Sequence, residues 1–177
     1  MRAIALSLVA VLALAGPAHA AGVGFSLPKF RALSVGSGAT AATSIGGSVQ
    51  VVGTTFSIRP IKFDVGLDYA FTRNFAGGTN YSFFDINVGA GLPIGLTEQF
   101  YLEPAVDTHT LLFVASPEAL GNPAFGAGPR LTAGFRPTGN ISVELSAGYA
   151  VMLNLTAAGR ATGGGLTTVE IGGTYSF

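Results

Sequence analysis

Residues 167–177 read TTVEIGGTYSF, and their side chains alternate in character from one position to the next. The odd-numbered positions are mainly apolar and include Val169 and Tyr175, whereas the even-numbered positions carry hydroxyls, a glycine and Glu170. Side chains in an extended strand point alternately to its two faces. The stretch is therefore predicted to be a β-strand with one apolar and one polar face, ending on the aromatic Phe177.

The same period-two alternation recurs upstream and is strictest at 61–72, where IKFDVGLDYAFT places an apolar side chain at every odd position. Comparable patterns predict eight strands in all, at 24–35, 44–58, 61–72, 81–92, 100–111, 125–136, 141–153 and 167–177. The alternation of the first two is loose, so their registers stay open. With an even number of antiparallel strands, the last lies beside the first and the sheet closes without exposed edges. The sequence therefore predicts an all-β, eight-stranded, antiparallel up-and-down transmembrane barrel.

The predicted connectors alternate in length along the chain. Four are longer, at 36–43, 73–80, 112–124 and 154–165, and three are shorter, at 59–60, 93–99 and 137–140. Short periplasmic turns and longer surface loops are typical of outer-membrane barrels. Residues 116–121 (SPEALG) have an N-cap, a proline at the first helical position and a closing glycine, which predict one helical turn. The loop 112–124 is also apolar enough to form a lid or a partner-binding patch, as an alternative to an ordinary loop.

Composition restricts the class of protein further. Charged residues make up 10% of the chain, against about 25% in ordinary soluble domains. Yet no apolar run after the first 20 residues approaches the roughly 20 residues that a membrane helix needs. These features favour a membrane β-sheet whose apolar face meets lipid, and an exported, unusually apolar β-sandwich is the alternative. The chain has no cysteine, which excludes disulfides and thiol chemistry.

Residues 1–20 have the three parts of a secretory signal peptide. Arg2 supplies the positive charge, an apolar core follows, and Ala18 and Ala20 form the small-x-small cleavage site. A retained membrane anchor is the alternative, but the core is short and a Gly-Pro pair interrupts it. We therefore expect a signal peptide followed by one barrel domain at 21–177.

The charged residues of the well-patterned strands share one face. All ten lie at polar-face positions: Lys62, Asp64, Asp68, Asp85, Glu103, Asp107, Arg130, Arg136, Glu144 and Glu170. In an outer-membrane barrel this face lines the lumen. An eight-stranded barrel is just wide enough to be filled by its own side chains, so we expect a salt-bridged plug with Arg130 as its central cation. Because carboxylates outnumber the basic groups, a narrow cation-preferring channel is the alternative.

Two further strand features carry expectations. Pro104 and Pro129 lack an N–H within neighbouring strands, so a β-bulge is predicted there. Aromatic residues gather near the strand ends and are predicted to form two interfacial rims. The periplasmic rim would contain Phe100, Phe135, Tyr175 and Phe177, and the outer rim Tyr69, Phe71, Phe84, Phe125 and Tyr149.

The signal peptide, the alternating strands and the final Tyr175-x-Phe177 together resemble the small OmpA-like or opacity-type outer-membrane barrels. The resemblance covers the whole chain after the signal peptide, but it is one of architecture. It implies an outer-membrane location, a monomer surrounded by outer-membrane lipids, and a terminal Tyr175-x-Phe177 signal that the barrel-insertion machinery reads. The resemblance leaves open a structural or a surface-interaction role. After loss of Arg2, eight basic residues face nine acidic ones, which gives no electrostatic case for nucleic acid.

His109 is the one candidate for catalysis after the signal peptide, with Asp107 beside it on the same face. Barrel enzymes that modify lipid A use a histidine with a serine and an acid, and the deacylase-like pattern places the serine two residues after the histidine. Here that position is Leu111. We therefore expect His109 to be a polar residue near the lumen mouth, and we expect no enzyme activity, cofactor or metal. A lipid-modifying enzyme stays as the second alternative.

Overall fold

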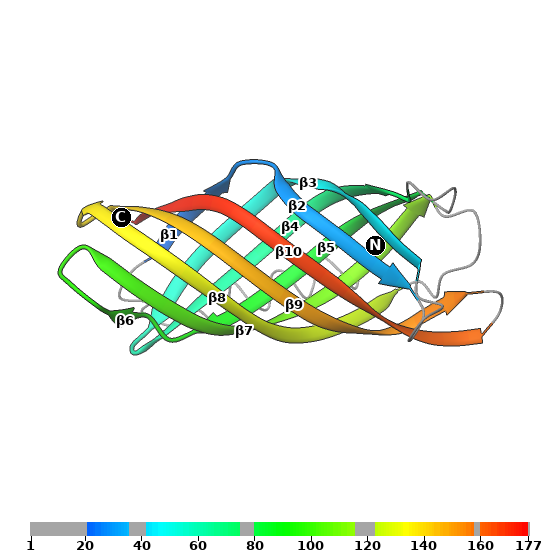
Figure 1. The fold of residues 1–177 in the computed structure, drawn as a ribbon. Coiled ribbons are helices and arrows are strands. Elements are labelled where there is room, and N and C mark those ends of the chain that lie inside the picture. Colours follow the sequence, from blue (N-terminus) through cyan, green and yellow to red (C-terminus); the bar gives the residue numbers. More distant parts are fainter. Residues whose placement is uncertain (1–20, 36–41, 75–79, 116–122, 158–159, 177) are drawn as a thin grey trace.

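A computed structural model describes residues 21–35, 42–74, 80–115, 123–157 and 160–176. They form a single antiparallel sheet that closes into a barrel (Figure 1). The strands are β1 (Ala21–Ser26), β2 (Lys29–Val35), β3 (Ala42–Ile58), β4 (Ile61–Arg73), β5 (Tyr81–Gly91), β6 (Ile94–Gly95), β7 (Phe100–Ala115), β8 (Ala124–Thr138), β9 (Ile141–Ala157) and β10 (Arg160–Ser176). Among these residues no helix is long and apolar enough to cross a membrane.

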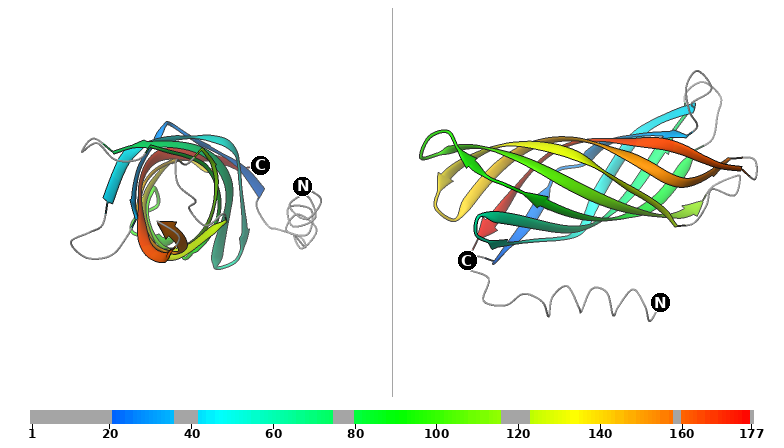
Figure 2. Two further views of the ribbon diagram at one scale, coloured as in Figure 1. Left: turned by 90° about the vertical axis from the view of Figure 1, so that its right-hand side faces the viewer. Right: turned by 90° about the horizontal axis from the view of Figure 1, so that it is seen from below.

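These elements make eight barrel strands, which confirms the predicted fold class. β1 and β2 are two halves of the first barrel strand, interrupted at Leu27-Pro28, and β6 is a short ladder beside β7. β10 closes the sheet, because it pairs with β9 on one side and with both β1 and β2 on the other. The end-on view in Figure 2 shows the resulting ring of strands.

The two ends of the barrel differ in their connectors. The turn end holds 59–60, 92–99 and 139–140, together with Ala21 and Ser176 at the outer ends of β1 and β10. The loop end holds the connectors 36–41, 74–80, 116–123 and 158–159. The predicted signal peptide and the predicted helical turn at 116–121 lie outside the described residues.

The strands run further toward the loop end than the sequence predicted. The prediction of a loop at 154–165 is wrong. Arg160 of β10 pairs with Ala157 of β9, so only residues 158–159 connect the two strands. Likewise, β7 continues to Ala115 instead of ending at Leu111. In β9 and β10 the alternation fades because small and polar residues replace the large apolar ones, whereas in β7 Leu112, Phe113 and Val114 are apolar in succession. The backbone pairing continues in both places.

The outward face of the barrel is apolar, as the alternation predicted. Its exposed large side chains include Val49, Val51, Phe71, Val106, Leu131, Val143, Leu145, Tyr149, Val151 and Ile171. The charged residues of the same strands point to the inside, because neighbouring positions of a strand face opposite sides. This arrangement inverts that of a soluble sandwich, whose charged face meets water.

Aromatic side chains lie on the outward face toward both ends. Phe100 and Phe135 pair across β7 and β8 near the turn end, with ring centroids 4.8 Å apart. Tyr69 and Phe84 pair across β4 and β5 nearer the loop end, with centroids 5.2 Å apart. Phe71, Phe125, Tyr149 and Tyr175 are exposed. Phe177 lies outside the described residues.

The predicted bulge at the two prolines is wrong. The β7–β8 register runs without a shift through Pro104↔Leu131 and Val106↔Pro129 among the described pairs. The β8–β9 ladder skips Pro129 and its neighbour Gly128 but resumes in the same register, so the missing N–H leaves a gap and not an extra residue. Register shifts occur elsewhere, for example between Gln50 and Val52 in β3.

Gly128 gives a direct test of this packing. A β-carbon added at Gly128 would overlap the carbonyl oxygen of Tyr149 and lie 2.8 Å from the Cα of Ala150, both of them backbone atoms. Gly128→Ala is therefore expected to lower the free energy of unfolding by about 1–3 kcal/mol, the usual cost of overpacking. Urea unfolding in detergent measures it. Gly163→Ala is the control, because the nearest atom to its added β-carbon is 4.0 Å away, and an equal loss in both variants would contradict the close approach.

Candidate functional site

The lumen is the part of the molecule where chemistry-bearing side chains gather. Its contents fall into three groups along the barrel axis. The apolar cluster comprises Leu33, Val35, Ala70, Tyr81, Phe83, Leu111, Ala124, Ala150, Met152 and Leu166, with Phe113 against it. The central charge cluster comprises Lys29, Arg31, Asp68, Asp85, His109 and Glu170, and the turn-side charge cluster comprises Lys62, Asp64, Glu103, Asp107, Arg130 and Glu144.

β2 supplies both cations of the central charge cluster, because Lys29 and Arg31 are two residues apart and share its inner face. The guanidinium of Arg31 bridges two strands: Nη2 pairs with Asp68 of β4, and Nη1 lies 3.1 Å from Oδ2 of Asp85 of β5. Lys29 Nζ lies 2.9 Å from the same Asp68 and 3.2 Å from Glu170 of β10. Asp68 is fully buried, and two cations compensate its charge.

His109 belongs to this cluster and not to the lumen mouth, so its predicted position was wrong. Nδ1 of His109 lies 3.0 Å from Oδ2 of Asp85, and the side chain is buried inside the barrel. Its sequence neighbour Asp107 contacts Arg130 instead. His109 therefore has an acid partner, but the pair lies inside the lumen and not on the face that the barrel turns outward.

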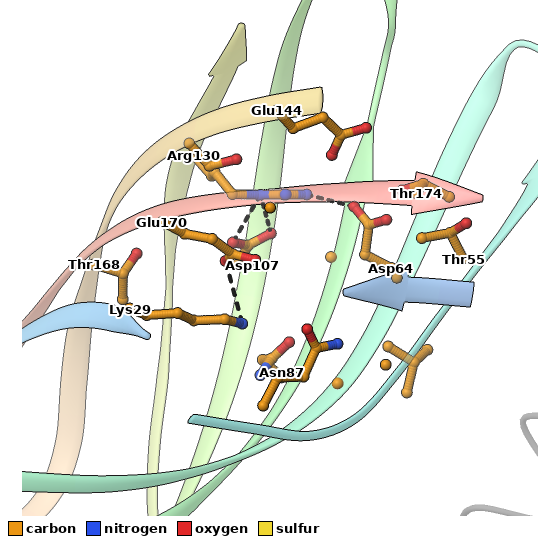
Figure 3. A pocket seen from close by; sticks show the side chains of 18 of the residues that line it. Lys29, Thr55, Asp64, Asn87, Asp107, Arg130, Glu144, Thr168, Glu170 and Thr174 are labelled. Carbon is orange, nitrogen blue, oxygen red and sulfur yellow. Dashed lines mark hydrogen bonds and ion pairs between the residues drawn. The ribbon is translucent and has the colours of Figure 1, made fainter. Parts of the chain in front are cut away.

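The turn-side charge cluster is built around Arg130, whose guanidinium meets carboxylates from two other strands. Nη2 lies 2.7 Å from Asp64 of β4 and 3.5 Å from Glu103 of β7, and Nε lies 3.0 Å from Asp107 of β7. Figure 3 shows Arg130 between Asp64 and Asp107, with Glu144 nearby. The contact with Asp64 crosses the interior and joins β8 to β4, two strands that do not pair with each other.

Lys62 is the second cation of the turn-side charge cluster. Its Nζ lies 3.2 Å from Glu144, 3.4 Å from Glu103 and 3.6 Å from Asp64. Tyr101 donates a hydrogen bond to Glu144, as does Ser142 from the strand that carries it. Glu103 is fully buried and is held by the charges of Lys62 and Arg130 without a hydrogen bond to either of its oxygens.

Of the ten charged residues predicted for the lumen, nine lie in the two charge clusters. The tenth, Arg136, is exposed at the turn end, where its guanidinium carbon lies 4.4 Å from the centre of the Tyr101 ring. The β8–β9 register shifts between Phe135 and Thr138, so Arg136 belongs to the end of the strand and not to the filled interior. Cation–π contact with Tyr101 stabilises it there.

Sequence reasoning missed the apolar cluster and the two cations of β2. The signal for Lys29 and Arg31 was present, because both stand at alternate positions before Leu33 and Val35. The inner face changes from charged to apolar along that strand, so the alternation of polar and apolar residues breaks down although the geometry does not. The rings of Phe83 and Phe113, 5.5 Å apart, extend the same apolar group.

Two cavities can be placed in the lumen among the described residues. One of about 80 Å³ lies between the charge clusters and is lined by polar groups that include Lys29, Asp107, Arg130 and Glu170 (Figure 3). The other, of about 350 Å³, lies at the turn end and is lined by residues that include Tyr101 and Arg136. Both lie on the turn side of the apolar cluster, none of whose members lines either cavity.

Comparison with known proteins gives a fold but no family. No family model and no curated protein matches the sequence. Neisserial surface protein A (NspA) is 15% identical, with a TM-score of 0.54 over 89% of this chain and 99% of that one. The outer membrane protein OprG of Pseudomonas aeruginosa is 8% identical, with a TM-score of 0.50 over 89% of this chain and 95% of that one.

This chain has the fold of the small outer-membrane β-barrels. The likeness spans the whole barrel of both neighbours, and it agrees with the resemblance drawn from the strand pattern. At these identities it extends to the fold alone.

Proposed function

We propose that the chain is an integral outer-membrane β-barrel with a closed lumen and a structural or surface-interaction role. The outward face carries exposed large apolar residues, and the strands keep their ionisable side chains inside, an arrangement that suits lipid on the outside. The turn end faces the periplasm and the loop end the cell exterior. Its partners are outer-membrane lipids and, through Tyr175 and Phe177, the barrel-insertion machinery, and it acts as a monomer.

The apolar cluster is the observation that supports a closed lumen most directly. Seven of its members are completely buried, and five of these have large side chains: Leu33, Phe83, Leu111, Met152 and Leu166. They lie between both cavities and the loop end of the barrel. Ions cross such an apolar constriction poorly because they would have to leave their hydration shells. Planar-bilayer recording of the purified barrel tests this proposal, and we expect no conductance above that of the empty bilayer.

Heat modifiability tests whether the chain forms a closed membrane barrel. An unheated sample should migrate faster on a detergent gel than a boiled one, since a closed barrel resists the detergent and stays compact. The same sample refolded into lipid vesicles should resist protease outside its connectors. Equal migration before and after boiling, together with full digestion, would contradict a membrane barrel. That result would favour the alternative, an exported β-sandwich.

A narrow cation-preferring channel is the second candidate, and the charge balance of the lumen favours it. The two charge clusters hold seven carboxylates against the four cations Lys29, Arg31, Lys62 and Arg130, a net charge of 4 − 7 = −3 with His109 neutral. Cations would concentrate in such a lumen if a path through the apolar cluster opened. A steady potassium-selective current in the parent protein would favour this candidate over the closed barrel.

We propose no enzyme activity, although His109 and Asp85 form an acid–base pair. The pair lies inside the barrel, and Leu111 stands at the position where the deacylase-like pattern has its serine. His109→Ala is therefore expected to leave the lipid A of the expressing cells unchanged by mass spectrometry, relative to cells with the parent protein. A lipid A modification present with the parent and lost with His109→Ala would establish the enzyme alternative.

A further inference from the structure

The wall of the barrel has a break in its pairing between the first barrel strand and β3. β1 pairs with β3 at only three positions, from Ala21↔Phe56 to Val23↔Thr54, and pairing resumes in β2 at Lys29↔Ser48. Among the described residues, no residue of 24–28 forms a β-ladder pair with a residue of 49–53. Figure 1 shows the connection between β1 and β2 as an arc at the upper edge of the barrel.

The break is confined to this one joint. On the other side of the first barrel strand, Ser26 pairs with Gly172, and the Leu27 N–H donates to the carbonyl oxygen of Ile171 at 2.9 Å. β3 likewise stays paired with β4 through a register shift between Gln50 and Val52. Pro28 contributes to the break, because it has no N–H with which to continue the ladder.

The cavity of about 80 Å³ lies directly behind the break. Its lining includes Gly24, Gln50 and Gly53 from the two segments that do not pair with each other, as well as charged residues of the lumen. A β-carbon added at Gly53 would overlap Nε2 of Gln50, and one added at Gly24 would lie 3.8 Å from the same atom. The Gln50 side chain therefore lies between Gly53 and Gly24, two residues without side chains, where the two segments fail to pair.

The outer side of the break is apolar. Leu27, Val51 and Val52 are more than half exposed, at 60%, 57% and 54%. Backbone N–H and C=O groups at membrane depth need polar partners, and irregular backbone is tolerated there where it lines a polar cavity. The break therefore lies between an apolar outer surface and a polar cavity. A ligand at this position would need both an apolar chain and a polar head group.

The charges of the cavity select the polar group. Every cation that lines it is already engaged by at least two carboxylates: Lys29 by Asp68 and Glu170, Arg31 by Asp68 and Asp85, and Arg130 by Asp64, Glu103 and Asp107. An anionic head would have to displace these carboxylates, whereas an ammonium head adds a cation where carboxylates are in excess. The cavity has room for about two or three water molecules at about 30 Å³ each, which suits a small head group and not a sugar.

We propose that residues 24–28 and 49–53 frame a side opening that binds single-chain alkylammonium amphiphiles. The ammonium head enters the cavity beside Gln50, and the alkyl chain lies along Val51 and Leu27. This inference rests on the membrane location proposed above, because the chain of the amphiphile must lie in the bilayer.

Nuclear magnetic resonance of the refolded barrel in lipid nanodiscs tests the inference. Dodecylammonium should cause saturable shifts of the Gln50 side-chain amide and of the backbone amides of Gly24 and Gly53, while Leu131 on another wall stays unchanged. Dodecanoate, with the same chain and the opposite charge, should cause none. Equal shifts with both amphiphiles would overturn the ammonium assignment, and no shift with either would overturn the side opening.

A cysteine pair tests the route, because the chain has no cysteine of its own. Continuation of the β1–β3 register places position 24 opposite 53, so a disulfide in Gly24→Cys/Gly53→Cys would close the opening. Oxidation should abolish the dodecylammonium shifts at Thr54 and Lys29, and reduction should restore them. Shifts that persist in the oxidised protein would overturn the side opening as the route.

Gln50→Trp fills the opening without a disulfide. It should weaken dodecylammonium binding by at least about tenfold, equal to about 1.4 kcal/mol, and unchanged affinity would count against the site. Heat modifiability of every sample separates the two proposals. A barrel that is heat-modifiable but does not bind refutes only this inference, whereas a protein without heat modifiability refutes the proposed function itself.

Discussion

Arg130→Ala is expected to lower the free energy of unfolding of the barrel by about 3–5 kcal/mol. The guanidinium is largely buried and touches Asp64, Glu103 and Asp107 within 3.5 Å. Without it, three carboxylates lie close together with Lys62 as the nearest remaining cation. The loss therefore exceeds the value of any single contact, because one lysine is left to compensate three largely buried carboxylates. Urea unfolding in lipid vesicles, followed by the heat-modified gel band, measures it.

Two variants separate charge from geometry at this position. Arg130→Lys keeps the positive charge but not the planar fork that reaches Asp64 and Asp107 together, so an intermediate loss is expected. Arg59→Ala removes an exposed guanidinium at the turn end and should change stability by less than about 0.5 kcal/mol. A loss in Arg130→Ala no larger than in Arg59→Ala would show that the turn-side charge cluster does not stabilise the barrel.

A double-mutant cycle identifies the partner that matters most. Asp64→Asn should cost less in the Arg130→Ala background than in the parent protein, because the carboxylate it removes is then a source of repulsion. The interaction energy measured in this way belongs to the pair and not to either residue alone. Additive losses would indicate that the 2.7 Å contact between them contributes little.

The fold could be predicted from the sequence because period-two alternation is a local signal. In 61–72 each outward position is apolar and each inward position small or polar, so the direction of every side chain follows from its parity. The same parity placed Asp64, Arg130 and Glu144 inside before any contact was known. Which of them touch each other could not be predicted, since Arg130 and Asp64 lie on strands that do not pair.

The rest of the lumen escaped prediction for two physical reasons. The inner face carries charge in one half of the barrel and apolar groups in the other, so Leu111 and Met152 look like breaks in the pattern although they point inward. The first barrel strand is also interrupted at Leu27-Pro28, which hides the shared face of Lys29 and Arg31. A pattern that averages over a whole strand cannot detect a change of environment along it.

Opening the apolar cluster is expected to turn a closed barrel into a conducting one. Phe83 of β5 and Leu111 of β7 are completely buried members of the apolar cluster on adjacent strands, and Phe83→Ala/Leu111→Ala removes the bulk of both. Each truncation of a buried side chain of this size costs about 2–5 kcal/mol, so the variant should also lose heat stability. Because the lumen below carries three more carboxylates than cations, the new current should be cation-selective, with a reversal potential that follows the potassium gradient.

The matched control removes the same two residue types from the outward face. Phe125 and Leu131 of β8 are exposed at 46% and 53%, so Phe125→Ala/Leu131→Ala changes only the surface of the barrel and should stay closed. Heat-modifiable protein is used for both recordings, so that only folded barrels are compared. A current of equal size in both variants would mean that it arises from a general loosening of the strands and not from the loss of the apolar cluster. A closed Phe83→Ala/Leu111→Ala barrel would instead assign the block to the charge clusters, where Arg130 and Lys62 fill the lumen without help from the apolar residues.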